Sequence, residues 1–199
     1  MSLDLILIPV AVALLCALVN LVKRQWVVNL AAMVLQYLAA FFLLTLVRPP
    51  NLAVVKLLVG WMVTLVLYVT LLSIGRFHKP QGLFSFSSGE LFRLASGLLL
   101  IALVMVFSSP LQAAVFPQAP VEILVGSLGL ITLGLLQLGT KDEPLYVILG
   151  FFTFFSGFEL LYASLEYSTL IEALFALMNL GLGLMGAYIL VKDQEVAQV

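Results

Sequence analysis

Long apolar runs, separated by short polar breaks, dominate this chain. A helix that crosses a bilayer needs about 20 mostly apolar residues, and several segments reach that length. The expected spanning helices cover residues 3–22, 26–47, 51–75, 91–109, 121–139, 145–167 and 169–191. The pattern predicts an all-α, polytopic integral membrane protein with about seven transmembrane helices.

The breaks between the runs contain residues that stop helices. Pro49 and Pro50 remove backbone donors and fix φ, so no helix is expected to run through them. Pro110, Pro117 and Pro120 interrupt a longer connection. The expected organisation is a four-helix membrane region (1–109), a loop (110–120), a three-helix membrane region (121–191) and a polar tail (192–199).

Lysine and arginine are distributed unevenly between the two ends of the predicted helices. Seven spans place seven basic residues on one side: Lys23, Arg24, Arg76, Lys79, Arg93, Lys141 and Lys192. The other side carries only Arg48 and Lys56. Because cytoplasmic loops carry the excess of basic residues, the C-terminus is expected in the cytoplasm and the N-terminus outside.

Composition agrees with a membrane location and excludes several functions. Hydrophobic residues make up 63% of the chain and charged residues 10%, against about 25% charged in soluble domains, and mean hydropathy is +1.21. A net charge of -1 argues against a nucleic-acid partner. Cys16 and His78 are single, which excludes a catalytic triad, a His-rich zinc site and bis-His haem ligation. No cofactor or metal motif is present, and we expect no enzyme activity from this chain alone.

The start of the chain does not look like a cleaved signal. It has no basic segment before the first apolar run, and no small-residue cleavage site follows that run. The first run is therefore expected to be a retained helix. Few charges and the absence of a cleavable signal favour a prokaryotic plasma membrane.

Glu159 is the most informative residue, because it interrupts an apolar run that is expected to cross the bilayer. A carboxylate at such depth costs roughly 3 kcal/mol on insertion scales, and residues of this kind commonly mark ion or proton paths. Two interpretations fit: Glu159 relays protons or cations, or it is a structural group bonded to a neighbouring helix. Gly150, Gly157 and Ser164 recur on another face of the same helix, which favours close approach of a neighbour there.

Lys56, Glu172 and Asn179 are further candidates for a proton or cation path. Lys56 lies about 8 Å inside its helix, so it either snorkels to the surface or pairs with Glu159 at similar depth. Glu172 fits a capping box that begins at Thr169. It also heads a helical stripe, and a stripe that is polar and then small suits a tightly packed interface. The stripe consists of Glu172, Ala176, Asn179, Gly183 and Gly186.

Residues 121–191 resemble the small three-helix membrane proteins of the complex I superfamily. The resemblance rests on Gly150, on Gly157 seven positions later and on Glu159 two beyond it, followed by an apolar last helix from Leu170. It extends to the K subunit of complex I, to the corresponding small subunit of multi-subunit Na⁺/H⁺ antiporters, and to the C-terminal part of membrane component E of energy-converting hydrogenases. Component E also places additional helices before this core. The K subunit carries a carboxylate two residues after the first glycine, where this chain has Phe152.

The resemblance implies a non-catalytic subunit of a proton- or cation-translocating complex. Its partners would be other membrane subunits, antiporter-like ones among them, within the lipid bilayer, and any redox chemistry would belong to those partners. Two alternatives remain: a structural or assembly subunit of another bioenergetic complex, and a stand-alone small transporter. Against the last, the sequence shows no matched pair of broken helices.

Overall fold

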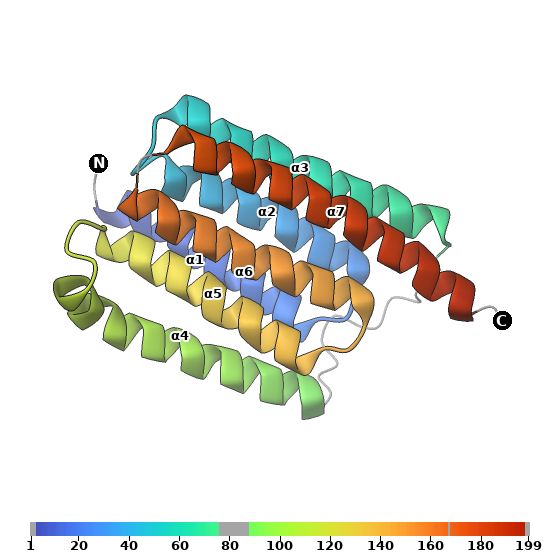
Figure 1. Ribbon diagram of the computed structural model, residues 1–199. Coiled ribbons are helices and arrows are strands. Elements are labelled where there is room, and N and C mark those ends of the chain that lie inside the picture. The colour runs from blue at the N-terminus through green and yellow to red at the C-terminus, as the bar shows by residue number, and fades with distance from the viewer. Residues whose placement is uncertain (1–2, 76–87, 167, 198–199) are drawn as a thin grey trace.

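The computed structural model describes residues 3–75, 88–166 and 168–197, and those residues form helices without any strand. His78 lies outside the described residues. The helices are α1 (Leu3–Val22), α2 (Trp26–Leu44), α3 (Pro50–Ser73), α4 (Ser88–Ala114), α5 (Val121–Thr140), α6 (Pro144–Leu165) and α7 (Thr169–Ala197). They lie side by side in alternating directions, with the two termini at opposite ends of the bundle (Figure 1).

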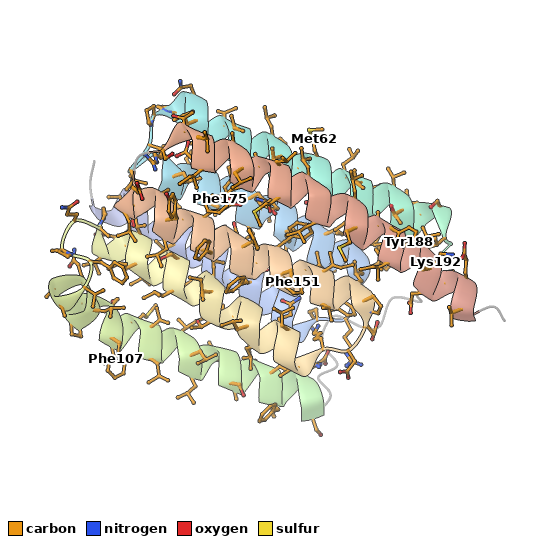
Figure 2. The ribbon with its side chains drawn as sticks, viewed as in Figure 1. Met62, Phe107, Phe151, Phe175, Tyr188 and Lys192 are labelled. Carbon is orange, nitrogen blue, oxygen red and sulfur yellow. The ribbon has the colours of Figure 1, made fainter. Side chains whose placement is uncertain are left out.

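Six of the described helices, α2 to α7, are long and apolar enough to cross a membrane. The described apolar part of α1 is shorter and covers Ile6–Val22. Large apolar side chains point away from the bundle, as Met62 on α3 and Phe107 on α4 do in Figure 2. The all-helical prediction is thus confirmed, and the helices carry the apolar outer surface that a bilayer requires.

The bundle has a central group of four helices, with one helix on one side and a pair of helices on the other. Helices α1, α2, α5 and α6 pack against one another, α4 covers α1 and α5, and α3 and α7 pair with each other alongside α2 and α6. Figure 1 shows α4 along one side of the bundle and the α3–α7 pair along the opposite side. The pairing of α3 with α7 joins segments that are far apart in the sequence, and the site described below lies along this pair.

Two buried apolar clusters fill the bundle. One lies mainly between α1, α2, α5 and α6, with Leu21, Leu43 and Leu130 fully buried in it. We call the other the α2–α3–α6 cluster; it consists of Leu30, Met33, Tyr37, Val63, Leu67, Leu71, Leu145, Tyr146, Ile148, Leu149, Phe152 and Leu190.

The predicted small-residue face of α6 packs tightly against α5. A Cβ atom at Gly157 would lie 2.6 Å from the backbone oxygen of Ser127 and 2.8 Å from the backbone nitrogen of Ile131. Conversely, a Cβ at Gly134 would lie 2.5 Å from the backbone nitrogen of Phe154. Glycine therefore allows the two backbones to come into direct contact, as the spacing predicted.

Two helices extend beyond their predicted ends. Helix α4 continues through Pro110 to Ala114, so the connection before α5 is shorter than the predicted loop. A proline this close to a C-terminus removes one hydrogen bond, and a helix in a membrane tolerates that loss. Helix α7 continues to Ala197, where the exposed pair of Lys192 and Glu195, 2.8 Å apart, stabilises the last turns. The segment predicted as a polar tail is therefore mostly helical.

Candidate functional site

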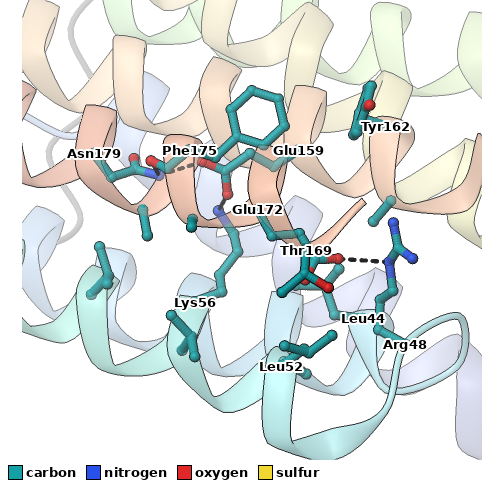
Figure 3. A pocket seen from close by; sticks show the side chains of 16 residues that line it. Leu44, Arg48, Leu52, Lys56, Glu159, Tyr162, Thr169, Glu172, Phe175 and Asn179 are labelled. Carbon is teal, nitrogen blue, oxygen red and sulfur yellow. Dashed lines mark hydrogen bonds and ion pairs between the residues drawn. The ribbon is translucent and has the colours of Figure 1, made fainter. Parts of the chain in front are cut away.

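Three helices meet at Glu159. Its Oε2 accepts a hydrogen bond from Lys56 Nζ of α3, and its Oε1 accepts one from Asn179 Nδ2 of α7 (Figure 3). The side chains of Lys56 and Glu159 are each 8% exposed. Both carboxylate oxygens therefore have a partner, and the buried charge of Glu159 is compensated by an ammonium group.

The helical stripe on α7 explains how Asn179 reaches this junction. Residues three and four apart share a face of a helix, and Gly183 and Gly186 let that face approach α3 and α6. A Cβ at Gly183 would lie 3.0 Å from Val63 of α3, and one at Gly186 would lie 3.0 Å from Ile148 of α6. The predicted close packing along this stripe is confirmed.

A second ion pair lies nearby, nearer the ends of the helices. Arg48 follows α2, and its Nε lies 2.7 Å from Oε1 of Glu172 in the first turn of α7. The Nη2 of Arg48 also donates to the backbone oxygen of Glu166. The Arg48 side chain is 1% exposed and that of Glu172 is 22% exposed. This pair ties the end of α2 to the connection between α6 and α7.

Both ion pairs line one cavity of about 150 Å³ between α3, α6, α7 and the end of α2 (Figure 3). The rest of the wall is mostly apolar and includes Leu52, Ala173, Phe175 and Ala176. Two cations and two carboxylates balance each other there. The cavity therefore combines ionisable groups with apolar walls, a setting in which electrostatic interactions are less screened than in water.

The four residues predicted from sequence all line this cavity: Lys56, Glu159, Glu172 and Asn179. Of the two interpretations of Lys56, the pairing with Glu159 is confirmed, and its side chain does not snorkel to the surface. Glu172 lies in the first turn of α7, and its carboxylate pairs with Arg48; the capping box with Thr169 stays a prediction.

Arg48 is the member of the site that sequence reasoning missed. It precedes two prolines and reads as a loop residue between helices. The distribution of charged residues along the sequence nonetheless indicated a role for Arg48. Arg48 and Lys56 are the two cations at the end of the bundle with few basic residues, and Glu159 and Glu172 supply two carboxylates to match them.

A second group of buried charges lies at the opposite end of the bundle. Lys141, directly after α5, is 3% exposed, and its Nζ donates to the backbone oxygen of Lys23 at 2.7 Å. Its ammonium lies 4.2 Å from the centre of the Tyr146 ring. Burial, and then the nearby charges of Arg93 and Arg24, lower the pKa of Lys141 to about 7.

Among the described residues, no group of three or more His, Cys, Asp and Glu side chains could hold a metal ion. A carboxylate held by an ammonium and an amide inside a membrane protein either fastens helices together or marks an ion or proton path. No known family model matches the chain, no curated protein matches its sequence and no solved structure matches its fold.

Proposed function

We propose that this chain is a non-catalytic membrane subunit of a multi-subunit complex that translocates protons or cations, and that the cavity around Glu159 lines part of the path. The observation that carries the proposal is a buried carboxylate, paired with Lys56 and Asn179, on the wall of a cavity that a second ion pair shares. Ionisable groups inside a membrane are costly, and they commonly mark ion or proton paths.

The charged groups lie at two depths in the cavity, which supports a proton or cation path more than a purely structural role. Glu172 is partly exposed, whereas Glu159 is deeper and nearly buried, and each has a cation beside it. A proton or cation that enters the cavity therefore meets two acceptor groups at successive depths. Lys56 and Arg48 compensate the charges of the two carboxylates, and an incoming cation would compete with them for the same oxygens.

The membership of a complex rests on the sequence resemblance to the complex I superfamily and on the apolar outer surface. Helices α3, α4 and α7 carry many exposed large apolar residues, which can contact lipid or other membrane subunits. In the proposed orientation the seven helices span a prokaryotic plasma membrane. The end with Lys23, Arg24 and Lys192 faces the cytoplasm, and Glu159 lies towards the outside.

A structural role is the second candidate function, and the geometry at Glu159 favours it directly. One carboxylate joins side chains from α3 and α7 to α6, so it can fasten three helices without transferring anything. The structural role and the translocating role require different properties of the side chain at position 159. Fastening needs hydrogen bonds, which a glutamine can also make, whereas translocation needs a group that changes its charge.

The first experiment is gentle solubilisation of native membranes, followed by identification of the proteins that purify with the chain. Antiporter-like membrane subunits, with or without hydrogenase or quinone-reductase partners, are the expected result. A homo-oligomer alone would contradict the proposal and favour a stand-alone transporter.

The second experiment compares Glu159→Gln with Glu195→Gln in the assembled complex. Glu195 is an exposed carboxylate on the last turns of α7 and serves as the matched control. We expect Glu159→Gln to assemble with a lowered thermal midpoint, because Lys56 loses its counter-charge. We expect ion uptake into membrane vesicles, measured per assembled complex, to slow at least about tenfold, because a proton-transfer group commonly contributes more than that. Normal uptake by an assembled Glu159→Gln complex would favour the structural role.

A further inference from the structure

The cavity at Glu159 becomes more exposed towards one end of the bundle. Along the face of α7 that lines it, Thr169 and Ala173 are exposed, Ala176 is half-buried and Asn179 is 3% exposed. The carboxylates follow the same gradient, with Glu172 at 22% and Glu159 at 8%. The open end of the cavity is therefore at the start of α7, beside the connection from α6.

The opposite direction is closed by tight packing. Beyond Asn179, Gly183 is in contact with Val63, and Gly186 is in contact with Ile148, in each case too closely for a Cβ to fit without movement. The α2–α3–α6 cluster continues from there, with Leu67, Leu149 and Phe152 at most 1% exposed. Most side chains of this cluster are apolar, and its two tyrosines, Tyr37 and Tyr146, are only 1% and 4% exposed.

The cavity has the size and the polar groups that water needs. A water takes up about 30 Å³ of liquid, so about 150 Å³ has room for several. Asn179 Oδ1 is buried and accepts no hydrogen bond from any described residue. Asn179 itself lines the cavity beside Glu159, and a buried acceptor of this kind is commonly satisfied by an ordered water.

The geometry points to a one-sided water vestibule that runs from the start of α7 to Glu159 and ends at the tight packing of α7 against α3 and α6. This inference rests on the proposed function in one respect: it specifies the side from which protons or hydrated cations reach Glu159. The Arg48–Glu172 pair lies near the mouth, and the Lys56–Glu159–Asn179 group lies at the closed end. An ion entering from this side therefore meets Glu172 first and Glu159 last.

Accessibility of single introduced cysteines tests the vestibule directly. The chain has one native cysteine, Cys16, which is buried, so the unmodified protein sets the background. Ala173→Cys and Ala176→Cys place thiols on the cavity wall at two depths. Ala40→Cys is the matched control, because Ala40 is 0% exposed on α2 and does not line the cavity. Lys192→Cys marks the opposite end of the bundle.

The reagent is a membrane-impermeant, positively charged methanethiosulfonate, applied to membrane vesicles of either orientation. Because reaction requires an accessible thiolate, we expect Ala173→Cys and Ala176→Cys to react about tenfold faster than Ala40→Cys. They should react from one face only, and Lys192→Cys from the other face only. Measuring both wall positions keeps the test decisive if one variant does not fold.

Three outcomes would overturn the vestibule. Labelling of Ala176→Cys no faster than Ala40→Cys would mean a closed apolar cavity. Labelling from both faces would mean a continuous channel, and labelling only by a lipid-soluble maleimide would mean an opening towards the bilayer. The labelling experiments do not measure translocation. The proposed function is tested separately, by ion uptake in the Glu159→Gln complex.

Discussion

Glu159 and Lys56 form a buried pair whose members depend on each other. Removing one partner of such a pair leaves an uncompensated charge and typically costs about 3–5 kcal/mol, whereas replacing both by apolar residues is often neutral. We expect Lys56→Met and Glu159→Leu each to lower the thermal midpoint strongly, and the double variant to recover most of the loss. A thiol-reactive fluorogenic dye can follow unfolding, because Cys16 is buried in the folded chain.

The exposed pair on α7 is the control for this comparison. Lys192 and Glu195 have side chains that are 54% and 59% exposed, and surface pairs of this kind contribute little. Lys192→Met, Glu195→Leu and their combination should leave the midpoint unchanged. Equal losses at both pairs, or no recovery in the Lys56/Glu159 double variant, would contradict the assigned pairing.

Lys141 predicts a pH dependence of stability at the basic end of the bundle. Its pKa is lowered to about 7 by burial and by Arg93 and Arg24, so between pH 7 and about 10.4, the unperturbed value for lysine, the unfolded chain binds a proton that the folded chain does not. Stability therefore rises with pH across this window, by up to about 1.4 kcal/mol per pH unit from this group. Below pH 7 both states are protonated, and the cost of the buried charge is constant.

The measurement is the thermal midpoint from about pH 6 to about pH 9.5, a range that spans most of this window, for the unmodified chain and for Lys141→Met. The unmodified chain should become more stable above pH 7, and Lys141→Met should lose most of that slope. Lys192→Met removes an exposed lysine and should keep the slope. An unchanged slope in Lys141→Met would show that other groups cause the pH dependence.

At the level of single residues, the sequence identified polar and charged side chains that interrupt an apolar run. Glu159, Lys56 and Asn179 stand out in this way, and their helical positions placed them at compatible depths. Arg48 and Lys141 did not stand out, because each follows a helix and reads as a solvated turn. Their burial depends on neighbours from distant segments, namely Glu172 for Arg48 and the end of α1 for Lys141.

At the level of helices, hydrophobic length and proline positions predicted each of the seven described helices. Several of their ends lie a few residues from the predicted positions. Pro49 directly precedes α3 and Pro144 is the first residue of α6, as expected, since proline fits before or at the first helical position. Pro110 did not end α4 as predicted, because tertiary packing and the apolar surroundings keep the remaining turn helical. A single residue near a helix end therefore defines a boundary poorly.

The contact of α5 with α6 predicts which glycines tolerate a methyl group. A Cβ at Gly157 would lie within 2.8 Å of backbone atoms of α5, which cannot rotate away, whereas a Cβ at Gly181 on α7 meets nothing within 4 Å. We expect Gly157→Ala to destabilise the chain by about 1–3 kcal/mol and Gly181→Ala to be neutral or slightly stabilising. The thermal midpoints of the two variants provide the check, and a tolerated Gly157→Ala would contradict the close approach.

At the level of the whole molecule, the sequence predicted neighbours in the chain but not the packing of distant helices. The short connection between α6 and α7 suggested an antiparallel pair, and the two do touch, yet α7 packs more extensively against α3. The cavity lies where α7 packs against α3 while its Phe175 ring contacts Phe158 and Tyr162 of α6. Hydrophobicity alone does not encode that choice, since every helix here is apolar on several faces.

The arrangement of the bundle predicts the orientation of the chain in the membrane. The helices alternate in direction and place the termini at opposite ends (Figure 1). Described basic residues outside the cavity gather at one end, among them Lys23, Arg24, Arg93, Lys141 and Lys192. Because basic loops stay in the cytoplasm, a fluorescent protein fused after residue 199 should be bright, since it folds there. Alkaline phosphatase fused at the same point should be inactive.

Fusions at the opposite end complete the topology test and bear on the direction of ion entry. Alkaline phosphatase fused after Pro117, in the connection before α5, should be active, because that end is expected outside. The mouth of the cavity lies at the same end, at the start of α7, so the orientation also fixes the side from which water reaches Glu159. Activity of both phosphatase fusions would contradict this arrangement, because it would mean that an even number of helices crosses between residues 117 and 199, so that one of α5, α6 and α7 does not span.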